Sequence, residues 1–143
     1  MTAVTMSDQP PPIATDRRPA WDIVIEYVAK RRDENAYGST VAVVDHVIAD
    51  MRDRDAIGRQ RYGVPLTAGN GRDHLIDAYQ EQCDACAYLV AQLDEHGVGP
   101  ASLLDEDRID CKLRWHLHCV QQLFAEQVRA LIQLRALIEE RSS

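Results

Sequence analysis

Positive charge is missing from a long internal stretch of this chain. No lysine or arginine occurs from residue 73 through residue 107, although the 143 residues include 16 of them. The formal net charge is −7. An acidic balance argues against broad electrostatic binding to nucleic acid or to an anionic membrane surface. It leaves room for a small anionic ligand bound at a local arginine cluster or through a metal ion.

Long apolar runs are also missing. No run approaches the roughly 20 residues that span a bilayer, and the N-terminal sequence "MTAVTMSDQPPPIATDRRP" has no hydrophobic signal core. We therefore expect a soluble, cytoplasmic protein with no membrane partner. In that compartment its four cysteines, Cys83, Cys86, Cys111 and Cys119, are expected to be reduced.

No stretch has the alternating pattern of a strand, and the chain has no internal repeat. Apolar residues recur instead at helical spacing. We predict an all-α, four-helix bundle-like fold, with helices over residues 18–32, 41–58, 72–95 and 103–140. Residues 1–18, which include three consecutive prolines, are predicted to be disordered, and residues 19–143 to form one domain.

Helix starts and assembly follow from the same pattern. Pro19 suits the start of the first helix, Ser39 or Thr40 can cap the second, and Asn70 or Gly71 is expected to open the third. The apolar side of the last predicted helix continues for about eight turns. Three shorter helices cannot cover that length, so we expect a homodimer or higher homo-oligomer formed through the last helix.

The stretch without positive charge carries a stripe of acids. Asp77, Glu81 and Asp84 fall on one side of the third predicted helix, opposite its apolar side. Carboxylates one turn apart repel one another. One interpretation is a solvated polar face, but such a face normally mixes lysine or arginine with its acids.

The preceding helix offers a second acidic pair, Asp50 and Asp53, at a spacing that lets both carboxylates approach one cation. Four carboxylates around one cavity cannot all stay charged without a counter-charge. Mg²⁺ or Mn²⁺ prefers oxygen ligands and would provide it. The alternative interpretation is therefore a metal site formed by Asp50, Asp53, Glu81 and Asp84.

These pairs resemble a known family. The order Asp50-x-x-Asp53, a gap, then Glu81-x-x-Asp84, together with the run "RDRDAIGRQRYGVPLTAGNGRDHLIDAYQEQCDACAYL", is similar to the MazG-like all-α nucleoside triphosphate pyrophosphohydrolases, and to their small phage-encoded members. The resemblance covers about residues 41–95. It implies a MazG-type fold and hydrolysis of a (deoxy)nucleoside triphosphate to the monophosphate and pyrophosphate, with Mg²⁺ or Mn²⁺ as cofactor.

The first pair departs from the family pattern, because both of its residues are aspartate where the family has glutamate. The shorter side chains reach less far toward a metal. Asp77, one turn before Glu81, can compensate as an extra ligand or as the base. We assign the catalytic role to Asp77 and Glu81.

Three arginines, Arg59, Arg61 and Arg72, lie between the acidic pairs in a segment that we predict to be a loop from residue 59 onward. Their guanidinium groups suit phosphate oxygens. The other interpretation is a polar surface loop with ordinary ion pairs. Tyr62 can stack on a base or act as a packing plug.

The cysteine and histidine residues give little further evidence for a functional site. Cys83-x-x-Cys86 lies in mid-helix on the side away from the acids, so we interpret it as apolar packing and not as a zinc or redox site. His46 precedes Asp50 by one turn and is a weaker candidate for a proton relay. The alternative function is a non-enzymatic helical accessory protein that oligomerises through its last helix.

Overall fold

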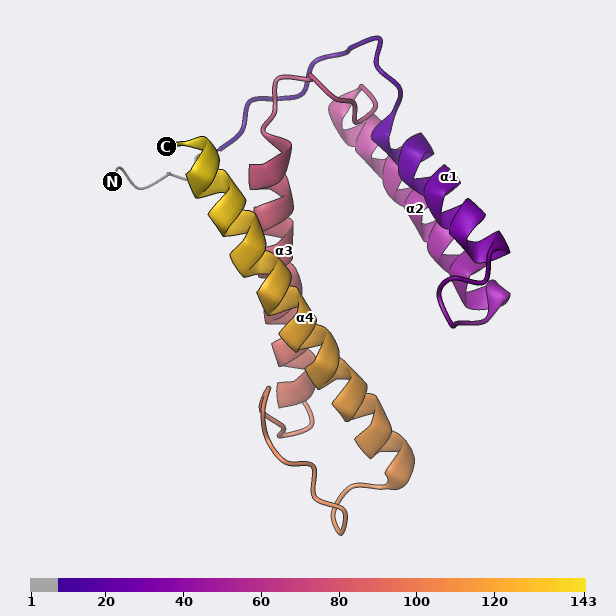
Figure 1. The fold of residues 1–143 in the computed structure, drawn as a ribbon, viewed down its shortest axis with the longest axis vertical. Helices are drawn as coiled ribbons and strands as arrows, with labels where there is room; N and C mark the ends of the chain where they lie inside the picture. The colour runs from indigo at the N-terminus through magenta and orange to yellow at the C-terminus, as the bar shows by residue number, and fades with distance from the viewer. Residues whose placement is uncertain (1–7) are drawn as a thin grey trace. The chain divides into compact units, whose positions relative to one another are not determined.

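The computed structural model describes residues 8–143; residues 1–7, part of the segment predicted to be disordered, lie outside the described residues. It contains four helices, α1 (Ala20–Asp33), α2 (Val41–Tyr62), α3 (His74–Asp94) and α4 (Cys111–Arg141) (Figure 1). Within residues 8–143 there is no strand, only an isolated bridge between Pro19 and Thr67. The predicted all-α class and the long C-terminal helix are confirmed.

The helices pair in chain order. α1 packs on α2 in one compact unit, Asp8–Arg72, and α3 packs on α4 in another, Asp73–Ser143 (Figure 1). Each unit is a helical hairpin. The single domain over residues 19–143, and the bundle of all four helices, therefore stay predictions.

The caps of the first hairpin are largely those expected. Pro19 precedes α1, and the Thr40 side chain caps α2 by accepting the N–H of Val43 at 3.3 Å. The predicted end of α2 at residue 58 is wrong, because a single internal glycine weakens a helix without breaking its hydrogen-bond ladder. The helix continues to Tyr62 and is capped by Gly63, which takes a φ of 75° and donates its N–H to the Arg59 carbonyl at 2.8 Å.

An extended N-terminal strap, residues 8–18, runs along the loop that follows α2. The Ile13 N–H donates to the Asn70 carbonyl at 2.9 Å, and the Thr15 hydroxyl donates to the Thr67 hydroxyl at 2.7 Å. Thr67 and Asn70 are buried. These specific contacts are made by residues that belong to the segment predicted to be disordered.

The second hairpin has an apolar core. Leu93 of α3 and Leu117 and Val120 of α4 form one buried cluster with Val98 of the connecting loop. Half-buried leucine and isoleucine side chains surround it: Leu89, Leu104, Ile109 and Leu113. Such a contiguous cluster is the main source of stability in a small helical unit.

Two predicted helix starts are wrong for the same reason. α3 is capped by Asp73, whose carboxylate accepts the N–H groups of Leu75 and Ile76, and not by Asn70 or Gly71. α4 starts at Cys111 and not at residue 103, because the Asp110 carboxylate caps it. A carboxylate that accepts two otherwise unpaired N–H groups defines a helix start strongly.

Asp73 also ties the two ends of its hairpin together. Arg141, the last residue of α4, donates to the Asp73 carboxylate at 2.5 and 3.2 Å. Burial by itself raises the pKa of Asp73, but Arg141 and the N–H groups of the α3 cap outweigh it, so the pKa lies below its ordinary value of 3.8. The start of α3 and the end of α4 are thus joined by an ion pair.

Two further expectations concern surfaces. None of the helices in residues 8–143 is long and apolar enough to cross a membrane. α4 buries Leu117, Val120 and Ile138 but leaves Leu123 and Leu137 about half exposed. The homodimer through α4 stays a prediction.

Candidate functional site

The first acidic pair lies on the side of α2 that α1 does not cover. α2 buries Val44 and Ile48 against α1, and helical geometry places Asp50 and Asp53 on the opposite side. Both side chains are exposed. Apolar residues Val43, Val47 and Ile57 lie on the same side as Asp50 and are 42 to 52% exposed. This side of α2 therefore combines uncovered apolar surface with carboxylates.

The second acidic group has the same relation to its own hairpin. Leu89 and Leu93 face α4, and Glu81 and Asp84 lie on the far side of α3. Glu81 and Asp84 are exposed, whereas Asp77, one turn before Glu81, is half-buried. The predicted acidic stripe on one side of the third helix is thus present.

The carboxylates of Asp50, Asp53, Glu81 and Asp84 make no hydrogen bond or ion pair with any residue from 8 to 143. Asp50 is unpaired although Arg54 lies one turn away on α2. By contrast, Asp55 on the same helix pairs with Arg59. Four carboxylates without partners are a donor set that a hard divalent cation fits.

To bind one metal ion, these four acids must also lie close together. In the part of the chain from residue 8 onward, no group of three or more His, Cys, Asp or Glu side chains is close enough to hold a metal ion. One predicted pair belongs to each hairpin. The four-carboxylate metal site and the catalytic roles of Asp77 and Glu81 therefore stay predictions.

The three predicted phosphate-binding arginines have different surroundings, and their binding of phosphate stays a prediction. Arg59 and Arg61 lie in the last turn of α2 and not in a loop, and two residues of separation on a helix point them to opposite sides. Arg59 donates to the Asp55 carboxylate at 2.9 and 3.1 Å. The Arg61 guanidinium lies 5.3 Å from the centre of the Tyr62 ring. Tyr62 is exposed, which does not fit the interpretation as a packing plug.

Arg72 is positioned by the loop and the N-terminal strap. Its guanidinium donates to the Pro10 carbonyl at 2.9 Å, and its backbone N–H donates to the Asn70 side-chain oxygen at 3.1 Å. Asn70 is fully buried, and its side-chain nitrogen has no hydrogen-bond partner within the described residues. The sequence pattern identified Arg72 but gave no signal for the strap, because its contacts join residues about sixty positions apart.

The histidine and the cysteines that the sequence analysis considered lie on three different helices. His46 is exposed on α2, one turn before Asp50. All four cysteines are free; Cys83 and Cys86 are half-buried on α3, and Cys111 is exposed at the start of α4.

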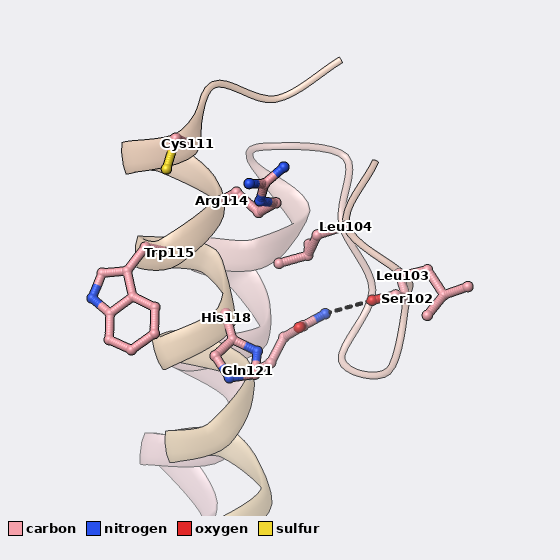
Figure 2. A pocket seen from close by; sticks show the side chains of 8 residues that line it. All are labelled: Ser102, Leu103, Leu104, Cys111, Arg114, Trp115, His118 and Gln121. Atoms are coloured by element: carbon pink, nitrogen blue, oxygen red, sulfur yellow. Dashed lines mark hydrogen bonds between the residues drawn. The ribbon is translucent and has the colours of Figure 1, made fainter. Parts of the chain in front are cut away.

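The second hairpin also contains a cavity that the sequence pattern did not indicate. It has a volume of about 380 Å³ and lies between the loop of residues 99–110 and the first turns of α4 (Figure 2). Its lining includes Leu104, Cys111, Arg114, Trp115, His118 and Gln121. None of the acids or arginines predicted to bind metal or phosphate lines it.

The chain is an all-α protein built from two helical hairpins, each with a partly uncovered outer face. Comparison with protein-family models, curated proteins and solved structures finds no match to it.

Proposed function

We propose that this protein is a metal-dependent hydrolase that cleaves a nucleoside triphosphate between its α- and β-phosphates, releasing the monophosphate and pyrophosphate. The main support is that each hairpin presents two carboxylates without partners on the face that its partner helix leaves uncovered. The proposal assigns the four carboxylates to one Mg²⁺ or Mn²⁺, because these cations prefer oxygen ligands.

The proposed roles follow from position and chemistry. A bound Mg²⁺ would polarise phosphoryl oxygens and lower the pKa of the attacking water. Asp50, Asp53, Glu81 and Asp84 would hold it through oxygen. Asp77, half-buried one turn before Glu81, would accept the proton of the attacking water, and Glu81 would orient that water.

The arginines would differ in their roles. Arg72 would bind the departing pyrophosphate, and its contact with Pro10 is compatible with this because a guanidinium carries five donors. Arg59 would first have to exchange its bond to Asp55 for one to phosphate. Arg61 would reach phosphate from the side of α2 that carries Asp50.

The direct test is a panel of ribo- and deoxyribonucleoside triphosphates with Mg²⁺ or Mn²⁺, scored for pyrophosphate release. We expect stoichiometric monophosphate and pyrophosphate, and no turnover in EDTA. Release of inorganic phosphate in place of pyrophosphate would contradict the proposed bond cleavage. Absence of turnover for every nucleotide would contradict the proposal as a whole.

A non-enzymatic accessory protein that oligomerises through α4 is the second candidate function. The half-exposed Leu123 and Leu137 on α4 favour it. Thermal unfolding with and without Mg²⁺ separates the two functions. If the acids bind a metal, the Tm should be higher in Mg²⁺ than in EDTA, because a bound ion stabilises the folded protein. An accessory protein with a solvated acidic face has the same Tm in both.

A further inference from the structure

The loop that forms one wall of the cavity beside α4 is held by hydrogen bonds. The Gln121 side-chain nitrogen donates to the carbonyls of Gly99 and Ser102, at 3.0 and 2.9 Å, and so holds the loop against α4 (Figure 2). Leu104, on the same loop, packs against the core cluster of the hairpin. A volume of about 380 Å³ lies within the range of small-molecule sites, which are usually preformed.

One cation lines this cavity without a counter-charge. Arg114 is half-buried, and its side chain makes no hydrogen bond or ion pair with any residue from 8 to 143. No carboxylate of residues 8–143 lines the cavity. Of the four acids in the adjoining loop, Asp105 pairs with Arg108 and Asp110 caps α4, whereas Glu106 and Asp107 are exposed outside the cavity lining. A guanidinium that is partly removed from water favours an anionic ligand.

Aromatic and apolar groups lie beside this cation. Trp115 is 68% exposed, an unusual position for so large an apolar side chain. The centres of the Trp115 and His118 rings are 6.0 Å apart, with the rings inclined at 34°. The two rings and Leu104 provide a surface on which a flat apolar group can lie.

We propose that this cavity binds a small organic anion with a planar apolar body, of the aromatic carboxylate class. The carboxylate pairs with Arg114, and the ring lies against Trp115, His118 and Leu104. The site belongs to the α3–α4 hairpin alone, uses none of the acids assigned to the metal, and stands independently of the proposed hydrolase function.

The test uses the intact 143-residue chain in EDTA, so that metal binding does not contribute. The chain has two tryptophans, Trp21 and Trp115, and therefore two indole N–H signals in a ¹⁵N-labelled sample; Trp115→Phe identifies the second. We expect benzoate to shift the Trp115 signal saturably, with a Kd below about 10 mM. Acetate, which lacks the ring, and benzamide, which lacks the charge, are each expected to bind at least about fivefold more weakly.

Variants assign the charge. Arg114→Gln is expected to weaken benzoate binding by about tenfold, because it removes a charge-assisted hydrogen bond. Arg129→Gln, an exposed position on α4 outside the cavity lining, is the matched control and should bind as the unmodified chain does. No saturable shift with benzoate, equal affinity for benzoate and benzamide, or unchanged affinity in a folded Arg114→Gln variant would each overturn the proposal. The benzamide comparison needs no variant and decides the matter if Arg114→Gln does not fold.

Discussion

The two hairpins stabilise themselves with different kinds of contact. The α3–α4 hairpin has a contiguous apolar cluster around Leu93 and Leu117, with an ion pair between its ends. The α1–α2 hairpin buries only two apolar residues, Val44 and Ile48, and relies on hydrogen bonds between the strap and the buried Thr67 and Asn70. In the α1–α2 hairpin, specific hydrogen bonds thus supplement a small apolar contact.

Both hairpins nevertheless leave the same kind of surface uncovered. In each, the side of one helix that faces away from its partner carries two unpaired carboxylates. The two hairpins therefore differ in the contacts that stabilise them but share the unpaired carboxylates of the proposed metal site. Substitutions can test stability and metal binding separately.

The largest expected effect tests the similarity. Glu81→Gln on α3 and Asp53→Asn on α2 should each lower pyrophosphate release by about two orders of magnitude or more, because each removes a charged metal ligand. Stability without metal should be unchanged or slightly higher, since repulsion between like charges is relieved. Asp94→Asn, another exposed acid on α3, is the control. Full activity in both variants would show that the acids are a solvated face.

The next effect tests the apolar core of the second hairpin. Leu117 is fully buried, so Leu117→Ala should lower the free energy of unfolding by about 2–5 kcal/mol. Leu103→Ala is the matched control, because Leu103 is 98% exposed. Urea unfolding measures both. A loss below about 1 kcal/mol for Leu117→Ala would contradict a core centred on this residue.

A smaller effect tests the polar ties of the first hairpin. Thr67→Val keeps the side-chain shape but removes the acceptor of the Thr15 hydroxyl, and should cost about 1 kcal/mol. The Ile13 amide, which donates to Asn70, should exchange its hydrogen faster in this variant. Amides of the α3–α4 core serve as internal controls. Unchanged exchange at Ile13 would mean that the strap does not depend on the buried threonine.

The smallest expected effect is the dependence of stability on pH in the acid range. Because the folded pKa of Asp73 is lowered, its contribution to stability is present above pH 3.8 and is lost as the pH falls through the folded pKa. Arg141→Gln should therefore lower stability at neutral pH by less than about 1 kcal/mol, since the pair is partly exposed. The difference from the unmodified chain should shrink in urea titrations as the pH falls below 3.8. A difference that does not shrink with pH would assign it to packing of the arginine stem.

Local sequence signals predicted much of the fold but little of what joins its parts. Apolar periodicity gave four helices, and Pro19 and Thr40 marked two starts, because these signals act within one turn of a helix. The start of α4 was missed because Ile109, four residues before Leu113, continues the apolar spacing beyond the Asp110 cap. The acids were identified by spacing alone. The cavity beside Arg114 and the ties of Asn70 were not, since they depend on residues distant in sequence.

The strap has a consequence for how the first hairpin can be rearranged. It brings the two ends of the Asp8–Arg72 segment together, since Pro10 contacts Arg72 and Ile13 contacts Asn70. A segment whose ends meet can be inserted into a loop of another protein, or circularly permuted, with only a short linker. New termini in the exposed turn of residues 34–39 would leave every strap contact in place. The closeness of its two ends thus gives the first hairpin the geometry of a segment that can be moved as one piece.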